Sequence, residues 1–212
     1  MKIISVNVAK PAVVLWRGEE VATSIFKKPS TQRLAVMRDN IEGDVQSDLT
    51  VHGGKLKAVY AYAAEHYPLW RKELKRNDLD SGMFGENLTV EGGLLEDDVF
   101  VGDLFRAGTS VLMAVQPRMP CYKLGIRFDT QQILKQFTKS RRYGVYFSIM
   151  EEGTVAAGDA MERLEKMGHG ISIRDIGRII MEGTDDVDLV RRALALDELP
   201  PNFKTYFRTL LE

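Results

Sequence analysis

The sequence predicts a mostly β protein with added helices: a small antiparallel β-barrel over residues 1–167 and a three-helix appendage over residues 168–212. Two observations support this fold class. The first two thirds of the chain consist mainly of short apolar segments separated by Gly and Asp, as in antiparallel barrels. After Gly168-His169-Gly170 the apolar residues recur at helical spacing instead.

The chain is expected to open with a strand and a hairpin. Ile3 to Val8 form the first apolar segment, and Val13 to Trp16 precede a predicted turn over residues 17–20. The return segment contains Val21 and residues 24–27. Further strands are predicted over residues 58–62, 99–101, 104–107, 110–116, 145–150, 154–157 and 160–166.

Two helices are expected to interrupt the strands. Tyr67, Trp70 and Leu74 lie at the i, i+3, i+7 spacing of an apolar helix face. Pro68 fits that helix only in its first turn, because proline lacks a backbone N–H. Asp129 is expected to cap the beginning of the second helix.

Three short helices are predicted in the appendage. Ser172 caps the first, Thr184 or Asp185 begins the second, and Pro200-Pro201 opens the third. So short a segment must dock on the barrel or on a partner. The apolar residues of the third helix also make it a candidate homodimer surface; they are Phe203, Tyr206, Phe207 and Leu210.

Composition restricts the classes of partner. The 212 residues are 44% hydrophobic and 28% charged, which suits a globular domain with a substantial core. A net charge of -1 supplies no broad cationic surface for nucleic acid or an anionic membrane. No apolar run approaches the roughly 18 residues of a membrane span. The single cysteine indicates a reducing compartment, so a cytoplasmic location is expected.

Common nucleotide and metal motifs are missing from the sequence. Gly53-Gly54-Lys55 suggests a phosphate loop, but Leu49 and Leu56 stand where that motif needs glycine and Ser or Thr. His52, His66 and His169 show no metal-ligand spacing.

The segment from Gln116 to Leu124 is the strongest candidate. Two prolines predict a stiff, non-helical backbone, and the only cysteine, Cys121, follows the second proline directly. Arg118 and Lys123 flank it, and nearby cations favour the reactive thiolate. The alternative is an inert, buried cysteine with solvated neighbours.

Two glycine-containing clusters are secondary candidates. Glu42-Gly43-Asp44 is followed by Val51-His52-Gly53-Gly54, whose glycines can present N–H groups to an anion. Gly82 to Leu88 contains Glu86 and Asn87 between a glycine turn and an apolar step. Taken singly, each cluster is better interpreted as a plain turn between strands.

Taken together, these motifs resemble the MOSC domain family, named for the C-terminal domain of molybdenum cofactor sulfurase. The resemblance is strongest to the stand-alone bacterial YiiM-like subgroup, which also has a small three-helix extension. The matching motifs, in chain order, are Val51-His52-Gly53-Gly54, Glu65-His66-Tyr67, Phe84-Gly85-Glu86-Asn87-Leu88, Gly102-Asp103 and Gln116-Pro117-Arg118 with Pro120-Cys121-Tyr122-Lys123-Leu124.

The resemblance implies a barrel of PK-like topology and a molybdenum cofactor, a metal held by molybdopterin. Cys121 is then the thiolate ligand of molybdenum and a catalytic residue, with His52 and Glu86 as candidate proton relays. Residues implied in cofactor binding are Gly53, Gly54, Asn87, Arg118 and Lys123, with Lys57 as a candidate by charge only.

The implied activity is reduction of N-hydroxylated small molecules, such as N-hydroxylated purine bases. Electrons are expected from a separate donor protein, because no flavin or dinucleotide motif is visible. One alternative is a sulfur carrier with a persulfide on Cys121. The family is associated with pyridoxal phosphate through the extra domain of full sulfurases, which this sequence lacks, so a separate protein would donate the sulfur. A non-enzymatic cofactor carrier is the third possibility.

Overall fold

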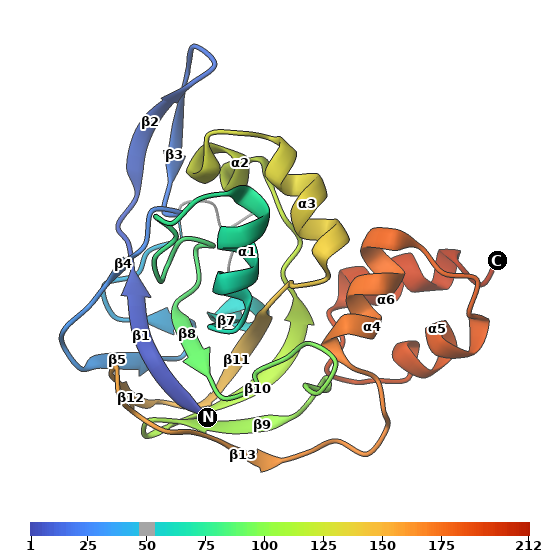
Figure 1. Cartoon of the computed structure of the whole chain (residues 1–212). Coiled ribbons are helices and arrows are strands. Elements are labelled where there is room, and N and C mark those ends of the chain that lie inside the picture. The colour runs from blue at the N-terminus through green and yellow to red at the C-terminus, as the bar shows by residue number, and fades with distance from the viewer. Residues whose placement is uncertain (47–53) are drawn as a thin grey trace.

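The computed structural model describes residues 1–46 and 54–212 and is built around one large, strongly curved sheet (Figure 1). The strand order is β13-β9-β10-β11-β7-β8-β1-β4, and every pair is antiparallel except the parallel pair β7–β8. The strands are β1 (Lys2–Val8), β4 (Lys28–Pro29), β7 (Val59–Ala63), β8 (Leu88–Glu91), β9 (Leu104–Ala107), β10 (Ser110–Pro117), β11 (Val145–Glu151) and β13 (Met161–Glu165).

The sheet curls until the beginning of β1 meets the beginning of β13. Lys2 bridges Ala160, and the Met161 N–H donates to the Met1 carbonyl over 3.0 Å. This contact closes the barrel and confirms the predicted fold class. Two smaller sheets complete the β structure. One has the order β12-β5-β6 and the other pairs β2 with β3; the strands are β2 (Ala12–Trp16), β3 (Glu19–Thr23), β5 (Leu34–Met37), β6 (Asn40–Ile41) and β12 (Gly153–Val155).

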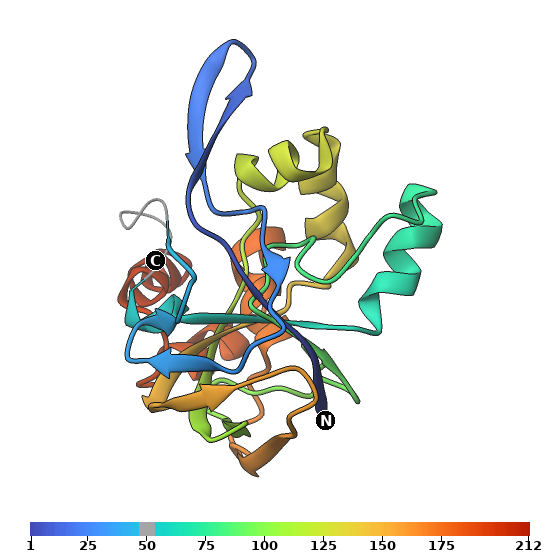
Figure 2. The same ribbon diagram turned by 90° about the vertical axis from the view of Figure 1, so that its left-hand side faces the viewer.

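Helices cover two separate parts of the barrel. Figures 1 and 2 show α1, α2 and α3 at one end, on the side toward which the β2–β3 hairpin projects, with α4, α5 and α6 grouped elsewhere. Within residues 1–46 and 54–212, no helix is long and apolar enough to cross a membrane. The helices are η1 (Lys55–Lys57), α1 (His66–Leu74), α2 (Tyr122–Phe128), α3 (Gln132–Ser140), α4 (Ile173–Gly177), the π-helical η2 (Arg178–Glu182), α5 (Val187–Leu194) and α6 (Pro201–Thr209).

The C-terminal helices share a core with the barrel. A single cluster of buried side chains runs from Phe105 and Phe147 of the barrel to Phe203 and Phe207 of α6. Phe203 and Phe207 therefore pack in the core of the protein and cannot contact a second copy. Tyr206 is exposed. A second, aromatic cluster lies under α1, α2 and α3 and is centred on Phe84.

Several local predictions are confirmed. Ser172 caps α4 in a reciprocal capping box with Asp175, and α6 begins at Pro201. Pro68 is the third residue of α1, within its first turn. These features depend on neighbours within four residues, so the sequence alone contains the information.

The prediction for Asp129 is wrong. Asp129 does not begin α3; it ends α2, an unpredicted helix, in a left-handed conformation (φ 56°) with its N–H donating to Gly125 and Ile126. Gln131 precedes α3 instead. Residues from Tyr122 onward are helical, so the stiff segment before α2 is shorter than expected.

Four other details differ from the prediction. Arg17 and Gly18 both have positive φ, 54° and 86°, and form a two-residue turn, so β3 begins at Glu19. Residues 24–27 then run as coil, while residues 99–101 contribute only a single bridge from Phe100. Asp186 caps α5, rather than Thr184 or Asp185.

Candidate active-site pocket

A pocket opens where β7, the connection from β10 to α2 and the chain after β3 meet. It holds about 600 Å³ of empty space, its open mouth included. Four cationic side chains and one carboxylate line its described part, together with the only cysteine. These charged residues are Lys27, Asp44, Lys57, Arg118 and Lys123.

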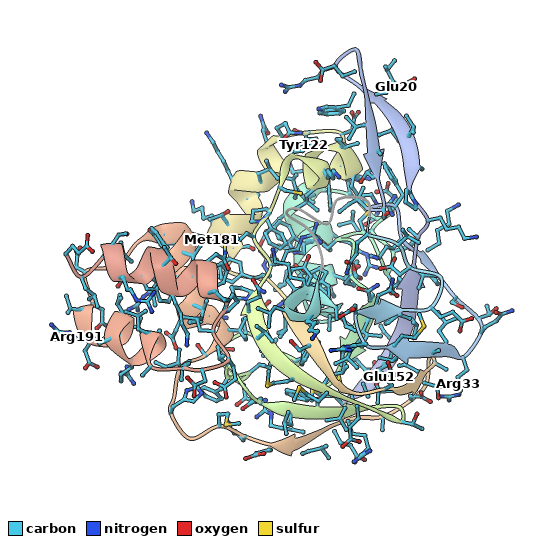
Figure 3. The ribbon with its side chains drawn as sticks, turned by 180° about the vertical axis from the view of Figure 1, so that it is seen from behind. Glu20, Arg33, Tyr122, Glu152, Met181 and Arg191 are labelled. Atoms are coloured by element: carbon cyan, nitrogen blue, oxygen red, sulfur yellow. The ribbon has the colours of Figure 1, made fainter. Side chains whose placement is uncertain are left out.

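Cys121 lies at the end of a short connection that two proline residues restrain. Pro117 ends β10, Pro120 precedes the cysteine, and Cys121 is extended (φ -118°, ψ 168°) directly before α2. The residue is half-buried and lines the pocket. Tyr122, the next residue, is labelled at the start of α2 in Figure 3. The thiol therefore faces an open cavity from a conformationally restrained backbone position.

Arg118 brings a buried positive charge to the pocket. Its guanidinium donates to the Phe84 carbonyl and lies 5.0 Å from the Tyr60 ring centroid. Gly85 makes this approach possible, since a Cβ there would lie 3.1 Å from Arg118 Nη1 and 2.8 Å from Ile25 Cδ1. Among the described residues, no carboxylate forms an ion pair with Arg118. A buried cation in this state favours an anionic ligand.

In contrast to Arg118, Lys27 has a carboxylate partner. It forms a buried ion pair with Asp44 in the pocket wall. The Lys27 ammonium donates to Asp44 Oδ1, which also accepts the Ala9 N–H over 2.9 Å. Asp44 Oδ2 accepts from Asn87 Nδ2 over 2.9 Å, and Asn87 Oδ1 accepts the Tyr60 N–H over 3.1 Å. Burial lowers the pKa of Lys27, although Asp44 opposes the shift.

Lys57 and Lys123 complete the cationic lining. Lys57 ends η1, and Lys123 lies in the first turn of α2, two residues after the cysteine. Burial lowers the pKa of Lys57, while the nearby Cys121 acts in the opposite direction. Cations close to a thiol stabilise its thiolate form, which is both the nucleophile and the metal ligand.

Glu86 lies behind the pocket rather than in its lining. It is completely buried and accepts from the Gly82 N–H (2.7 Å), the Phe84 N–H (3.1 Å), the Thr89 hydroxyl (2.9 Å) and Tyr67. Burial raises its pKa, and these hydrogen bonds oppose the rise. The contacts hold the turn whose Phe84 carbonyl receives Arg118. The geometry therefore favours a positioning role over contact with a ligand.

The pocket gathers five of the residues selected from the sequence: Cys121, Arg118, Lys123, Lys57 and Asn87. Gly54 is exposed at the start of η1 with φ 77° and is not part of the lining. His52 and Gly53 lie outside the described residues. Over residues 1–46 and 54–212, no group of three or more His, Cys, Asp or Glu side chains is arranged to hold a metal ion.

Sequence reasoning missed several pocket residues. Lys27 and Ser24 follow the β2–β3 hairpin, and Tyr146 comes from β11. Ser24 Oγ is buried without a hydrogen-bond partner in the described part of the chain, so it is free to bond to a ligand in the pocket. Asp44 was visible within Glu42-Gly43-Asp44, but its partners are 17 and 43 residues away and left no local signal.

The fold agrees with the comparison to known proteins. The sequence profile of the MOSC domain matches residues 48–162, more than half of the chain. The chain belongs to the MOSC domain family.

Its relatives place it in the YiiM-like subgroup. It is 37% identical over 205 residues to YflK of Bacillus subtilis, covering 97% of this chain and 92% of that protein. It is 32% identical over 172 residues to YiiM of Escherichia coli, covering 80% and 75%. A protein of Gibberella moniliformis named reductase is 31% identical over 182 residues, which cover 84% of this chain but only 32% of that protein.

Solved structures support the same assignment. The crystal structure of YiiM from Geobacillus stearothermophilus superimposes with a TM-score of 0.83 at 29% identity, covering 100% of this chain and 99% of that one. YiiM from Escherichia coli has a TM-score of 0.77 at 24% identity and covers 99% and 92%. The similarity includes the C-terminal helices, because both comparisons cover nearly the whole chain.

Proposed function

We propose that the protein is a molybdenum cofactor-dependent reductase of N-hydroxylated small molecules. The observation that carries the proposal is the juxtaposition of the Cys121 thiol with the buried, carboxylate-free Arg118 in one open pocket. Membership of the MOSC family and the relationship to a fungal reductase support the choice of an oxidoreductase.

The residues of the pocket fit the cofactor chemically. Molybdenum in a pterin dithiolene prefers soft sulfur ligands, so one protein thiolate is enough. Cys121 would supply that thiolate, while Arg118 and Lys123 would pair with phosphate or pterin oxygens. Ser24 Oγ, buried without a described partner, offers one more hydrogen bond. When bound, the cofactor supplies two-electron redox chemistry.

The reaction requires protons as well as electrons: R–NH–OH takes up two electrons and two protons to give R–NH2 and water. A separate electron-donor protein would supply the electrons. Among the described residues, Lys27 and Lys57 are candidate proton donors, because both line the pocket and burial lowers the pKa of each. Asp44 holds Lys27 Nζ in position. Glu86, one of the two relays expected from the sequence, does not line the pocket.

Metal analysis of the wild type and Cys121→Ser tests the proposal. Protein from a host that makes the cofactor should contain about one molybdenum per chain and reduce an N-hydroxylated purine with a chemical electron donor. Cys121→Ser should lose both properties and keep its melting temperature. Met119→Leu is the control, since Met119 is exposed in the same connection and does not line the pocket. Wild-type protein without molybdenum and without reductase activity would contradict the proposal.

The same preparations separate the alternative functions. A sulfur carrier would gain one sulfur atom on Cys121 from the persulfide of a cysteine desulfurase supplied with free cysteine, visible in the intact mass. A cofactor carrier would hold molybdenum without reducing any N-hydroxylated compound. The half-buried, pocket-facing position of Cys121 is compatible with a persulfide, so the mass measurement is a required comparison.

A further inference from the structure

A second hollow, the α3 groove, begins at the residue directly before the cysteine. It holds about 1240 Å³ of empty space, its open mouth included, and Pro120 is part of its lining. The next residue, Cys121, lines the pocket described above. The rest of the groove comes from α3, from Arg141 directly after it and from Glu182 of η2. One peptide bond therefore joins the wall of the groove to the thiol proposed as the metal ligand.

The α3 groove is cationic. Lys135, Lys139 and Arg141 line it and are exposed, and α3 contains no acidic residue. Arg141 is paired with Glu182, since its Nε donates to Oε1 over 2.8 Å; the neighbouring Met181 is labelled in Figure 3. Among residues 1–46 and 54–212, neither lysine has an ion-pair partner. Like charges at i, i+4 on a helix repel each other, so an anionic partner would relieve this repulsion.

The positive charge extends over the whole segment that contains the cysteine and α3. Residues 117–142 contain seven Lys or Arg and one Asp, a net charge of +6. The complete chain has a net charge of -1, so the other residues together carry -7. Such an asymmetry attracts and orients an acidic protein that approaches this side of the molecule.

An electron donor is the partner that fits this position. The inference rests on the proposed reductase function, which requires two electrons per turnover from a separate protein. A donor at the α3 groove would reach the Pro120–Cys121 connection and leave the mouth of the pocket open for the substrate. Electron-transfer complexes have small interfaces, and charge rather than a large apolar contact brings the partners together. Exposed lysines without ion-pair partners in the described chain match that kind of interface.

We propose that the α3 groove is the docking site of a small, acidic electron-transfer protein that supplies the electrons for the reaction. Carboxylates of this partner would pair with Lys135 and Lys139, and its redox centre would face the Pro120 side of the cysteine connection. Each turnover oxidises the partner by two electrons in total. R–NH–OH takes up these electrons with two protons and gives R–NH2 and water. A carrier of single electrons would bind twice per turnover.

Binding of two purified acidic electron-transfer proteins, a flavodoxin and a plant-type ferredoxin, tests the proposal by surface plasmon resonance. At least one should bind the wild type at low salt, with an affinity that falls as salt screens the charges. Lys135→Glu/Lys139→Glu should weaken this binding at least about tenfold, because two attractions become repulsions. Its melting temperature should not fall, since both side chains are exposed.

The matched control is Arg191→Glu/Arg208→Glu, which changes the net charge equally at exposed positions of α5 and α6. It should bind the probe protein as the wild type does. A wild type that binds neither probe, or a lysine double variant that binds as tightly as the wild type, would overturn the proposal. An oligonucleotide that binds more tightly than both probes would identify nucleic acid as the ligand and would also overturn it.

The choice of electron source provides a second test. Dithionite is a small donor that needs no docking site, so Lys135→Glu/Lys139→Glu should reduce an N-hydroxylated purine with it at the wild-type rate. With the reduced probe protein the rate should fall at least about tenfold. Equal rates of variant and wild type with the probe protein would overturn the docking site. A wild type that is inactive with dithionite would instead contradict the reductase function, so the two failures are distinguishable.

Discussion

Buried charge is arranged differently in the pocket and in the interior behind it. In the interior, Glu86 accepts four hydrogen bonds from its own chain, and Glu96 accepts the Gly144 N–H over 2.6 Å and lies 3.0 Å from His66 Nε2. In the pocket, Arg118 is equally buried but has no carboxylate partner among the described residues. The interior acids therefore hold backbone groups of their own chain in place, whereas Arg118 has no carboxylate partner among the described residues and is available to an anionic ligand.

The largest effect on the free energy of unfolding is expected for Glu86→Ala, a substitution in the interior. Glu86→Ala removes the shared acceptor of two backbone N–H groups and two hydroxyls, all buried. It should lower the free energy of unfolding by about 4 kcal/mol in a urea titration, since each unsatisfied buried donor is costly. Glu91→Ala, at an exposed position of β8, should change it by less than about 0.5 kcal/mol. Equal effects of Glu86→Ala and Glu91→Ala on the free energy of unfolding would contradict the structural role of Glu86.

Arg118→Met is expected to affect the molybdenum content more than the free energy of unfolding. Methionine keeps the packing but leaves the Phe84 carbonyl without its donor, so the free energy of unfolding should fall by about 1 to 2 kcal/mol, less than for Glu86→Ala. The molybdenum content should nevertheless fall about tenfold, because a charge-assisted contact to the cofactor is lost. Arg106→Met, on the exposed side of β9, should keep its metal. A strongly destabilised Arg118→Met would show that this arginine mainly supports the fold.

A smaller effect concerns stability at high pH. The folded-state pKa of Lys27 lies below the ordinary 10.5, so the unfolded chain binds more protons there. The free energy of unfolding should therefore rise with pH between the lowered value and 10.5. The rise should be shallower in Lys27→Met/Asp44→Asn, measured by urea unfolding at several pH values. Lys139→Met, at an exposed position of α3, should keep the wild-type slope of the free energy of unfolding against pH. An unchanged slope in Lys27→Met/Asp44→Asn would contradict the assignment of this pH dependence to Lys27.

The smallest effect is expected at the surface. A hydrogen bond from Arg76 lowers the pKa of Asp78 from 3.8 to about 2. The stabilisation is present above pH 3.8 and is lost as the pH falls through about 2. Asp78→Asn should shift the urea midpoint slightly at pH 5, and the difference from wild type should shrink toward pH 2. A difference that grows with acid would refute the ion pair.

Part of the site was predictable because its residues are neighbours in sequence. Arg118, Cys121 and Lys123 lie within six positions, so their composition alone indicated a thiol among cations. The two prolines correctly indicated a restrained backbone, but the helix that begins at Tyr122 was not expected. Asp129 was misassigned because a short polar residue between two helices can end one or begin the next.

By itself, the sequence determined the fold class, the C-terminal helices and the cysteine segment, because strand periodicity, caps and proline positions act over a few residues. Only the tertiary structure decided that Glu86 supports the Phe84 turn, that Lys27 pairs with Asp44 and that Phe203 and Phe207 face inward. These outcomes depend on contacts between residues distant in the chain. Closure of the barrel brings such residues together, and no local pattern records which ones will meet.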